Sequence, residues 1–396
     1  MTRVPILSFH SVGDDVLPFD LRHLSTHPKV LEKSLRWLNR HHFTTISLEH
    51  LFFHLQEGSP VPDRSLVLAF DDGYLDNWCF VHPLLKKYGH QGFILVTPEF
   101  VPNETEVRPT IEDVWQGNLS PENLPKRGYC NWEELRAMHE AGTLKTYSHS
   151  MTHTWWPTSS KVVDFHRPNA PWIPGIWNEN PIHEKPYWMT ESSAEIARKL
   201  PWGTPVFENA RSQCAPRVFP PALSNHPMVE YVRKHGGEDF FKKPGWKEQL
   251  LSTQTAPVES VPRESQEDYE TRLRFEFGES RRIIEQEIPG HTCSFFAWPG
   301  GEWNETTQKI ALEFYDATLT TQHHVTISGE DPQLIHRLFF GQRSPELTGL
   351  IWPSVWKFTA RLLQHGGHSK ARIRNWIANC AIGLGKCFLK GNRNYR

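Results

Sequence analysis

Two aspartates follow an apolar run in the segment SLVLAFDDG, and two histidines stand four residues apart in the segment HSMTH. They are Asp71, Asp72, His149 and His153. One carboxylate and two imidazoles form a three-ligand set that leaves a metal ion such as zinc an open position for water. The second carboxylate can take the proton of that water. These residue types and positions predict a hydrolase that uses a metal ion.

The elements that would position these residues are those of an α/β fold. Short apolar runs alternate with segments of helical periodicity, and this predicts repeated βα units around a parallel sheet or barrel. The aspartates and His149 then stand at the carboxyl ends of strands, as barrel active sites require. Asn131 followed by Glu134 predicts a capped helix start. We expect strands over 4–9, 65–70, 92–97, 144–148, 294–298 and 317–320, and helices over 29–41, 76–88, 131–141, 264–287 and 306–314.

The periodicity fades from residue 155 to about residue 262, where Trp, Pro, Asn and His are frequent. This stretch is too aromatic for a disordered linker and too long for a bare loop. It therefore predicts an insertion that packs on the barrel rim. We expect a first barrel part (1–154), the insertion (155–275), a second barrel part (276–345) and a C-terminal tail (346–396).

The charge of the chain is nearly balanced, with a formal net charge of −2. This argues against a nucleic-acid binder that works through overall positive potential. The N-terminus has no apolar stretch of signal-peptide length, and no run of 18 apolar residues occurs. These observations predict a cytoplasmic protein.

The tail differs in charge from the rest of the chain, because no acidic residue follows Glu346 whereas nine Lys and Arg do. Apolar residues there fall at helical spacing and include Trp352, Trp356 and Trp376. Apolar stripes flanked by cations and interfacial Trp are typical of helices that lie on an anionic membrane surface. The other interpretation is that the stripes close the bottom of the barrel and the cations form a solvated face.

Four segments of the sequence resemble, in order, motifs of the polysaccharide deacetylase family, the NodB-homology group also called carbohydrate esterase family 4. The resemblance covers roughly residues 4–154 and 276–340, and the motifs are specific because they occur together. ILSFHSVGDD is similar to the opening of the branch that deacetylates poly-N-acetylglucosamine, in which a late catalytic histidine is relocated to the N-terminus. The other three segments are LVLAFDDGYLDN, NWEELRAMHEAGTLKTYSHSMTHT and SRRIIEQEIPGHTCSFFAWPGGEWN.

The resemblance implies a distorted (β/α)7 TIM-like barrel with a long Trp- and Pro-rich insertion. It also implies removal of the N-acetyl group from an amino sugar in a polysaccharide or lipid-linked saccharide precursor. Asp72, His149 and His153 would hold a divalent metal, for which zinc suits the ligands and cobalt, nickel or manganese could replace it. Asp71 would be the general base, and His10 is our candidate for the general acid, because imidazole titrates near neutral pH. The spacing of four predicts that the two metal histidines share one side of a helical turn.

The expected substrate-binding residues are Tyr74, Trp298, Pro299, Gly300 and Arg337. A backbone N–H near Tyr74 would stabilise the oxyanion. Many relatives carry an arginine ahead of the Pro-Gly motif to orient the base, but this chain has Ser294 and Phe295 there. Arg337, in LIHRLFF, or another basic residue would take that role, unless Arg337 is a surface or structural arginine. Trp298 is expected either to form the floor of the sugar-binding site or to pack in the core.

Our hypothesis is a cytoplasmic deacetylase, peripheral on the inner membrane face, that acts on an N-acetylated glycan made there. A catalytically silent carbohydrate-binding protein on the same barrel is the alternative, because the usual arginine is absent. Metal-dependent hydrolysis of a non-sugar amide or phosphate ester fits the ligands but not the Trp-rich insertion. No nucleic-acid partner is expected.

Overall fold

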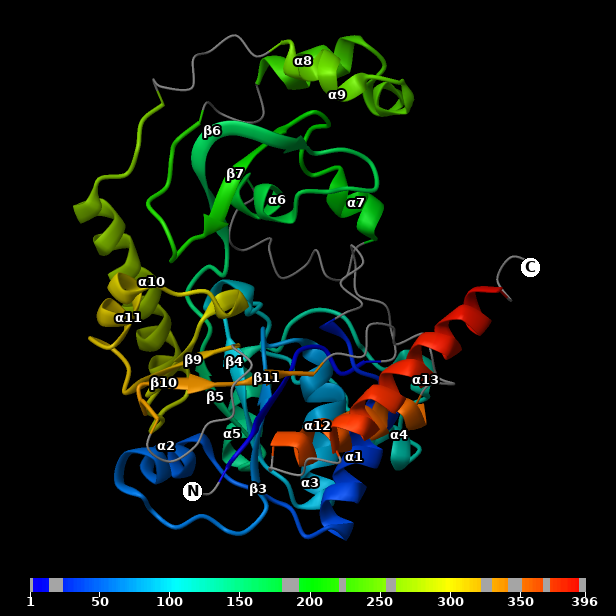
Figure 1. Cartoon of the computed structure of the whole chain (residues 1–396), viewed down its shortest axis with the longest axis vertical. Helices are drawn as coiled ribbons and strands as arrows, with labels where there is room; N and C mark the ends of the chain where they lie inside the picture. The colour runs from blue at the N-terminus through cyan, green and yellow to red at the C-terminus, as the bar shows by residue number, and fades with distance from the viewer. Residues whose placement is uncertain are drawn as a thin grey trace.

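A parallel sheet that curls into a nearly closed barrel forms the centre of the computed structural model (Figure 1). The model describes residues 3–13, 24–179, 192–220, 226–253, 261–321, 330–340, 351–365 and 371–391. The strands follow the order β10-β9-β8-β5-β4-β3-β1-β11, and β2 pairs with β3 outside this path. Their bounds are β1 (Ile6–Phe9), β2 (Thr44–Thr45), β3 (Ser65–Phe70), β4 (Gly92–Val96), β5 (Leu144–Ser148), β8 (Phe295–Ala297), β9 (Ala317–Thr320), β10 (Leu334–His336) and β11 (Leu338–Phe339).

The segment that contains β10 and β11 joins the two ends of the sheet. β10 pairs with β9, β11 pairs with β1, and Arg337 alone separates β10 from β11. The Arg337 backbone N–H donates to the carbonyl of Thr320 at 2.9 Å, and the Phe340 N–H donates to the carbonyl of Ser8 at 2.7 Å. Counted as one strand, β10 and β11 give seven strand positions. The expected distorted (β/α)7 barrel is confirmed.

The strands are buried on both faces because helices cover the outside of the barrel. All six residues of β3 and all five of β4 are buried, which explains their continuous apolar sequence. The apolar face of α1 includes Val30, Leu35 and Leu38, all buried. The covering helices are α1 (Pro28–Arg40), α2 (Leu48–Glu57), α3 (His82–Tyr88), α5 (Trp132–Glu140), α10 (Gln266–Glu287) and α11 (Glu305–Ala311).

The predicted bounds of β3, β5 and β9 match the structure, and most other bounds differ by one to three residues. The capping box at the start of α5 is present, with Asn131 and Glu134 bonded to each other's backbone N–H. Residues 76–88 are not one α-helix, because a π-helical turn η2 (Asn77–Val81) precedes α3. Short helical segments lie in the connections: η3 (Pro98–Phe100), α4 (Ile111–Trp115), η4 (Pro121–Asn123) and η9 (Pro299–Gly301).

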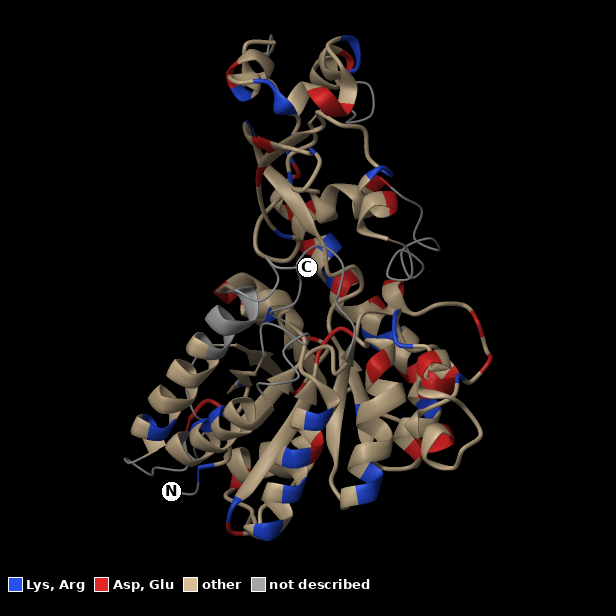
Figure 2. Ribbon diagram, turned by 90° about the vertical axis from the view of Figure 1, so that its right-hand side faces the viewer, with Lys and Arg blue, Asp and Glu red and all other residues tan. Residues whose placement is uncertain are grey.

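The insertion forms a separate lobe above the barrel, built on an antiparallel strand pair (Figures 1 and 2). One apolar cluster joins Trp172 and Phe207 of the insertion to Tyr74, Phe100 and Tyr129 of the barrel loops. The predicted boundary between residues 275 and 276 falls inside α10, which starts at Gln266. The elements of the lobe are β6 (Trp155–Phe165), α6 (Ile173–Glu179), α7 (Ser193–Ala197), β7 (Pro205–Arg211), α8 (Pro227–Lys234), η7 (Gly237–Lys242) and α9 (Trp246–Leu251).

The tail forms the helices α12 (Ile351–His365) and α13 (Ala371–Gly391), which pack on each other and, through α12, on α1 (Figure 1). α12 buries Val355, Phe358 and Leu362 in the main core, and the Phe358 ring contacts Phe9 and Phe340 beside the closing strands. Among the described residues, no helix is long and apolar enough to cross a membrane. Both helices also expose large apolar side chains: Trp352, Trp356, Ile373, Trp376, Ile377 and Leu384.

Candidate active site

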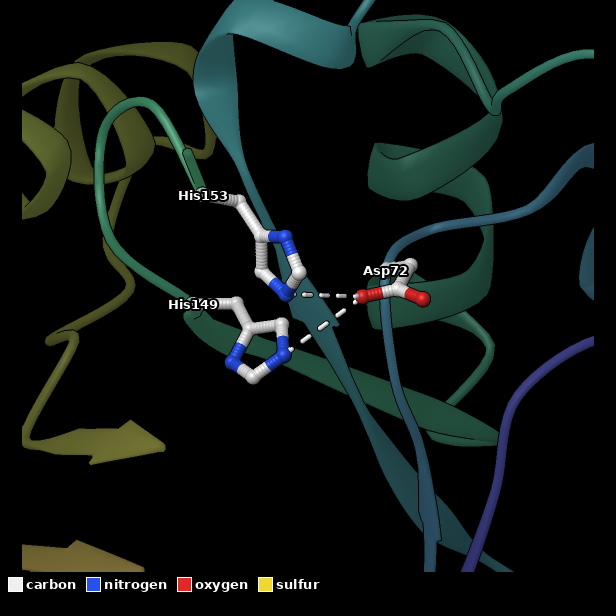
Figure 3. A group of neighbouring side chains, drawn as sticks. All are labelled: Asp72, His149 and His153. Atoms are coloured by element: carbon white, nitrogen blue, oxygen red, sulfur yellow. Dashed lines mark ion pairs between the residues drawn. The ribbon is translucent and has the colours of Figure 1, made fainter. Parts of the chain in front are cut away.

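The structure brings Asp72, His149 and His153 together at the carboxyl ends of the strands (Figure 3). Asp72 follows β3, His149 follows β5, and His153 stands two residues before β6. The Nε2 atoms of both histidines lie 3.5 Å from Oδ1 of Asp72. The three ligand atoms lie within 4.8 Å of one another, which is the geometry of a group that could hold one metal ion.

The chemistry of these donors fits a divalent metal. The Nδ1–H of His149 donates to the carbonyl of Ala297 at 2.8 Å, so its Nε2 carries the lone pair and faces Asp72. Asp72 Oδ1 is buried and has no hydrogen-bond partner among the described residues, although a buried carboxylate oxygen normally has one. Burial lowers the pKa of His149, and burial together with neighbouring His149 lowers the pKa of His153 well below its ordinary value. Both imidazoles are therefore neutral near pH 7, as metal binding requires.

The backbone at the ligands adopts rarely populated conformations. Asp72, Ser150 and His153 have φ angles of 73°, 69° and 47°, in the left-handed region that L-residues avoid. The segment from His149 to His153 is therefore a loop, and the predicted helical turn is wrong. The side chains converge because two left-handed residues fold the loop back. Such strain persists at functional sites only when surrounding contacts hold it.

Glu276 on α10 is one of the contacts that hold this loop. Its carboxylate accepts from the backbone N–H groups of Met151 and Thr152, both at 3.1 Å, and from the Thr152 hydroxyl at 2.6 Å. Burial raises the pKa of Glu276, and the hydrogen bonds of Thr152 oppose this shift. Glu276 could not be predicted from the sequence, because nothing distinguishes one glutamate from the others in a charged helix.

Asp71 is buried beside the ligands and is held by side chains from two other strands. Nη1 of Arg337 lies 2.6 Å from Oδ1 of Asp71, and the Ser8 hydroxyl donates to the same oxygen at 3.0 Å. Nε2 of His10 lies 3.8 Å from Oδ2 of Asp71. Burial raises the pKa of this carboxyl, but the neighbouring Arg337 cation, which also donates a hydrogen bond to it, outweighs burial and lowers the pKa. Asp71 is thus ionised and aimed at the site.

Arg337 contacts the base and cannot reach a substrate directly, because its side chain is completely buried. Its assignment to substrate binding is therefore wrong, while the contact that the sequence suggested with Asp71 is present. Arg337 stands where the closing strand passes between β9 and β1, so it approaches Asp71 from a different part of the barrel than an arginine ahead of the Pro-Gly motif would.

Trp298 does not floor a sugar site. Its side chain is completely buried, and its ring packs edge-on against Phe277 and Phe296 in the main core. Pro299 is also buried. Gly300 has a φ of 67° and leads the turn after β8 toward the insertion. Of the three residues, Gly300 alone stays accessible enough to line the site.

Tyr74 lies in the loop after Asp72, and its ring stacks on Tyr129 with the centroids 5.5 Å apart. Burial and the charge of Asp72 raise the pKa of the Tyr74 phenol well above its ordinary value. Within the described part of the chain, the Tyr74 backbone N–H makes no backbone hydrogen bond. Its role as a donor to the oxyanion stays a prediction.

Comparison with known proteins agrees with the barrel fold and with the motifs found in the sequence. Residues 58–237 match the family model "Polysaccharide deacetylase". A putative polysaccharide deacetylase of Bacillus subtilis is 28% identical over 94 residues, which are 24% of this chain and 32% of that protein. Poly-β-1,6-N-acetyl-D-glucosamine N-deacetylase of Escherichia coli is 22% identical over 149 residues, which are 38% of this chain and 20% of that protein. The matches thus span a third or less of these curated relatives.

Two solved structures share the fold. A de-N-acetylase from Aggregatibacter actinomycetemcomitans aligns with a TM-score of 0.51 and 16% identity, over 85% of this chain and 94% of that one. The BpsB deacetylase domain from Bordetella bronchiseptica aligns with a TM-score of 0.50 and 18% identity, over 85% of this chain and 96% of that one. At these identities the likeness shows the barrel fold alone.

Proposed function

The chain belongs to the polysaccharide deacetylase family, and from this premise we propose that it removes N-acetyl groups from an amino-sugar glycan and releases acetate. The observation that carries the proposal is the juxtaposition of two differently held aspartates. One oxygen of Asp72 faces two imidazoles and has no hydrogen-bond partner in the part of the chain that the structure describes, and Asp71 is ionised beside them. One carboxylate is thus equipped to hold a metal and the other to accept a proton.

Each side chain has a role in amide hydrolysis under this proposal. Asp72, His149 and His153 hold the divalent ion, which when bound would polarise the acetamide carbonyl and make water a better nucleophile. Asp71 accepts the proton of the attacking water. The backbone N–H of Tyr74 donates to the developing oxyanion. His10, beside Asp71, protonates the leaving amine.

The substrate that we propose is an N-acetylated glucosamine glycan, either a polymer or a lipid-linked precursor. The name of the Escherichia coli relative and the N-terminal position of His10 support this choice. Zinc is the proposed metal because two imidazoles and one carboxylate suit it, and cobalt, nickel or manganese would fit the same donors.

Paired substitutions of the two aspartates test the function. We expect Asp71→Asn to abolish acetate release from N-acetylglucosamine oligomers while the metal content stays near one equivalent, and Asp72→Ala to lose both. Metal is measured by elemental analysis, and acetate by an enzyme-coupled assay. A wild-type protein that binds the oligomers and releases no acetate with any of the four metals would favour the alternative, a silent carbohydrate-binding protein.

We also propose that α12 and α13 contact an anionic membrane surface on the cytoplasmic side. Trp352, Trp376 and Leu384 are about 60% exposed, and Arg372 and Arg374 are exposed beside them. Apolar anchors combined with cations, in a tail without acidic residues, complement a negatively charged bilayer.

Co-sedimentation with vesicles tests this contact. We expect binding to phosphatidylglycerol-containing vesicles and none to neutral phosphatidylcholine vesicles. Trp376→Ser should weaken binding, and Arg372→Gln should weaken it about fivefold. Phe275→Ser and Phe53→Ser are matched controls, because these rings are similarly exposed elsewhere. Equal binding by all variants would overturn the contact, as would assembly of the protein into dimers through this face.

A further inference from the structure

Arg211 brings a positive charge from the insertion to the candidate active site. It ends β7 and pairs in register with Trp155, the first residue of β6, which follows His153 by two positions. The Ser212 backbone N–H donates to the carbonyl of Thr154 at 2.9 Å, which fixes the end of the hairpin beside the metal-ligand loop. The strand pairing therefore places Arg211 beside the loop that carries His153.

The guanidinium of Arg211 lies between an indole and the turn that follows β8. Its Cζ atom is 4.6 Å from the centroid of the Trp155 ring. On another side lies Gly300, where a Cβ atom would come within 2.8 Å of Nη2 and 2.9 Å of Nε. A side chain at Gly300 would displace the guanidinium. The close approach and the φ of 67° both explain glycine at this position.

Arg211 differs from Arg108 and Arg272 in having no carboxylate partner among the described residues. Arg108 pairs with Glu134 at 2.6 Å and Arg272 pairs with Glu264 at 2.7 Å. Within the described part of the chain, Arg211 makes no ion pair and donates no hydrogen bond, and its Nε is buried without a partner. Burial lowers the pKa of Arg211, and the charges of Glu302 and Asp72 oppose this. An arginine nevertheless stays charged, so the site holds a cation that pairs directly with no carboxylate among the described residues.

We propose that Arg211 binds a carboxylate group of the ligand, so that the insertion supplies an anion-binding subsite next to the metal ligands. The planar fork of a guanidinium matches the two oxygens of a carboxylate, and charge-assisted bonds of this kind are strong. The carboxylate comes either from the acetate that the reaction releases or from an acidic substituent on the glycan. The second source rests on the proposed function, whereas acetate binding can be measured without turnover.

The experiment compares two arginines of the insertion segment. Arg217 lies over Trp156, with Cζ 5.0 Å from the ring centroid, but it faces Glu264 at 3.6 Å, so Arg217→Met is the matched control for Arg211→Met. The full-length protein, with its metal content measured, is titrated with fluoroacetate and followed by ¹⁹F NMR. If acetate is the source, Arg211→Met weakens fluoroacetate binding at least about 10-fold and Arg217→Met leaves it unchanged.

A second arm tests an acidic glycan. The value of kcat/KM is measured for a neutral N-acetylated oligosaccharide and for one that carries a carboxylate. If the sugar is the source, Arg211→Met loses at least about 10-fold more on the acidic substrate, with fluoroacetate affinity unchanged. The proposal is overturned if Arg211→Met matches Arg217→Met in both arms.

Arg211→Lys is a second variant that keeps the test decisive if Arg211→Met does not fold. It keeps the charge but loses the bidentate fork, so we expect an effect between those of wild type and Arg211→Met in whichever arm responds. Circular dichroism and thermal unfolding establish that the variants fold. If Arg211→Met does not fold, Arg211→Lys decides alone, and wild-type values in both arms would overturn the proposal.

Discussion

Nη1 of Arg337 lies 2.6 Å from Oδ1 of Asp71, although the two residues are 266 positions apart in the chain. Both side chains are enclosed in the barrel, and removal of one partner from such a pair leaves an uncompensated buried charge. The contact therefore links the stability of the barrel to the ionisation of the proposed base.

Substitution of Arg337 by methionine should affect stability and activity together. We expect a loss of about 3–5 kcal/mol in the free energy of unfolding, measured in urea, because the Asp71 carboxylate remains buried without its cation. The pKa of Asp71 should rise, since the main influence that lowers it is gone, and the low-pH limb of acetate release should move to higher pH. Arg282→Met is the control, because that arginine forms an exposed pair with Glu279. Equal stability of the two variants would contradict the prediction.

Substitution of His10 by glutamine should separate proton donation from the other steps. An amine must leave protonated, whereas a nitrophenolate does not need a proton. We expect kcat for N-acetylglucosamine oligomers to fall about 10²–10⁴-fold, and hydrolysis of 4-nitrophenyl acetate to change much less. His41→Gln, on the exposed end of α1, should leave both activities intact. An equal loss on amide and ester would exclude His10 as the general acid.

Substitution of Glu276 by glutamine should loosen the metal-ligand loop without touching a ligand. The amide oxygen can keep one backbone bond, but the charged acceptor for Met151 and Thr152 is lost. We expect metal affinity to fall about 10–100-fold, as for other groups that support a ligand, measured by competition with a chromophoric chelator. Glu279→Gln on the same helix should bind metal like the wild type. Unchanged affinity in Glu276→Gln would show that the loop keeps its shape by itself.

The pH dependence of metal retention follows from the two histidines. Only neutral imidazole binds a metal, so protonation competes with it. The pKa values of His149 and His153 are both lowered, so these groups remain neutral where an ordinary histidine, with a pKa near 6.5, is already half protonated. We expect the protein to keep its metal through pH 6 and to lose it only at more acidic pH, as measured by dialysis and elemental analysis. Half-loss near pH 6.5 would contradict this.

Much of the barrel could be predicted because its strands are short, apolar and separated by capped helices. β3, β5 and β9 have the predicted bounds, and Asn131 caps α5 as expected. The proximity of Asp72, His149 and His153 could be predicted from the sequence, because the carboxyl ends of the strands in a barrel converge. Their local path could not, because it depends on left-handed backbone angles at Asp72, Ser150 and His153 that tertiary contacts maintain.

The residues that surround the site were harder to predict, since their roles depend on distant strands and helices. Arg337 was expected to bind substrate and to orient Asp71, unless it was a surface or structural arginine, and the barrel closure places it against Asp71. Trp298 is one position past β8 and faces the core, because the packing of α10 covers it through Phe277. Nothing in the sequence near Arg211 indicated that a hairpin would return it to His153.

The strand that closes the barrel also sets the earliest moment at which the protein can become active. Asp71 is synthesised early, but its cation belongs to the last barrel segment, between β10 and β11. A chain still on the ribosome, or one cut before residue 337, holds the proposed metal ligands and a base that lacks its partner. We therefore expect the proposed hydrolysis to require the segment that contains Arg337, and truncation before residue 337 should abolish it while every proposed metal ligand is still present.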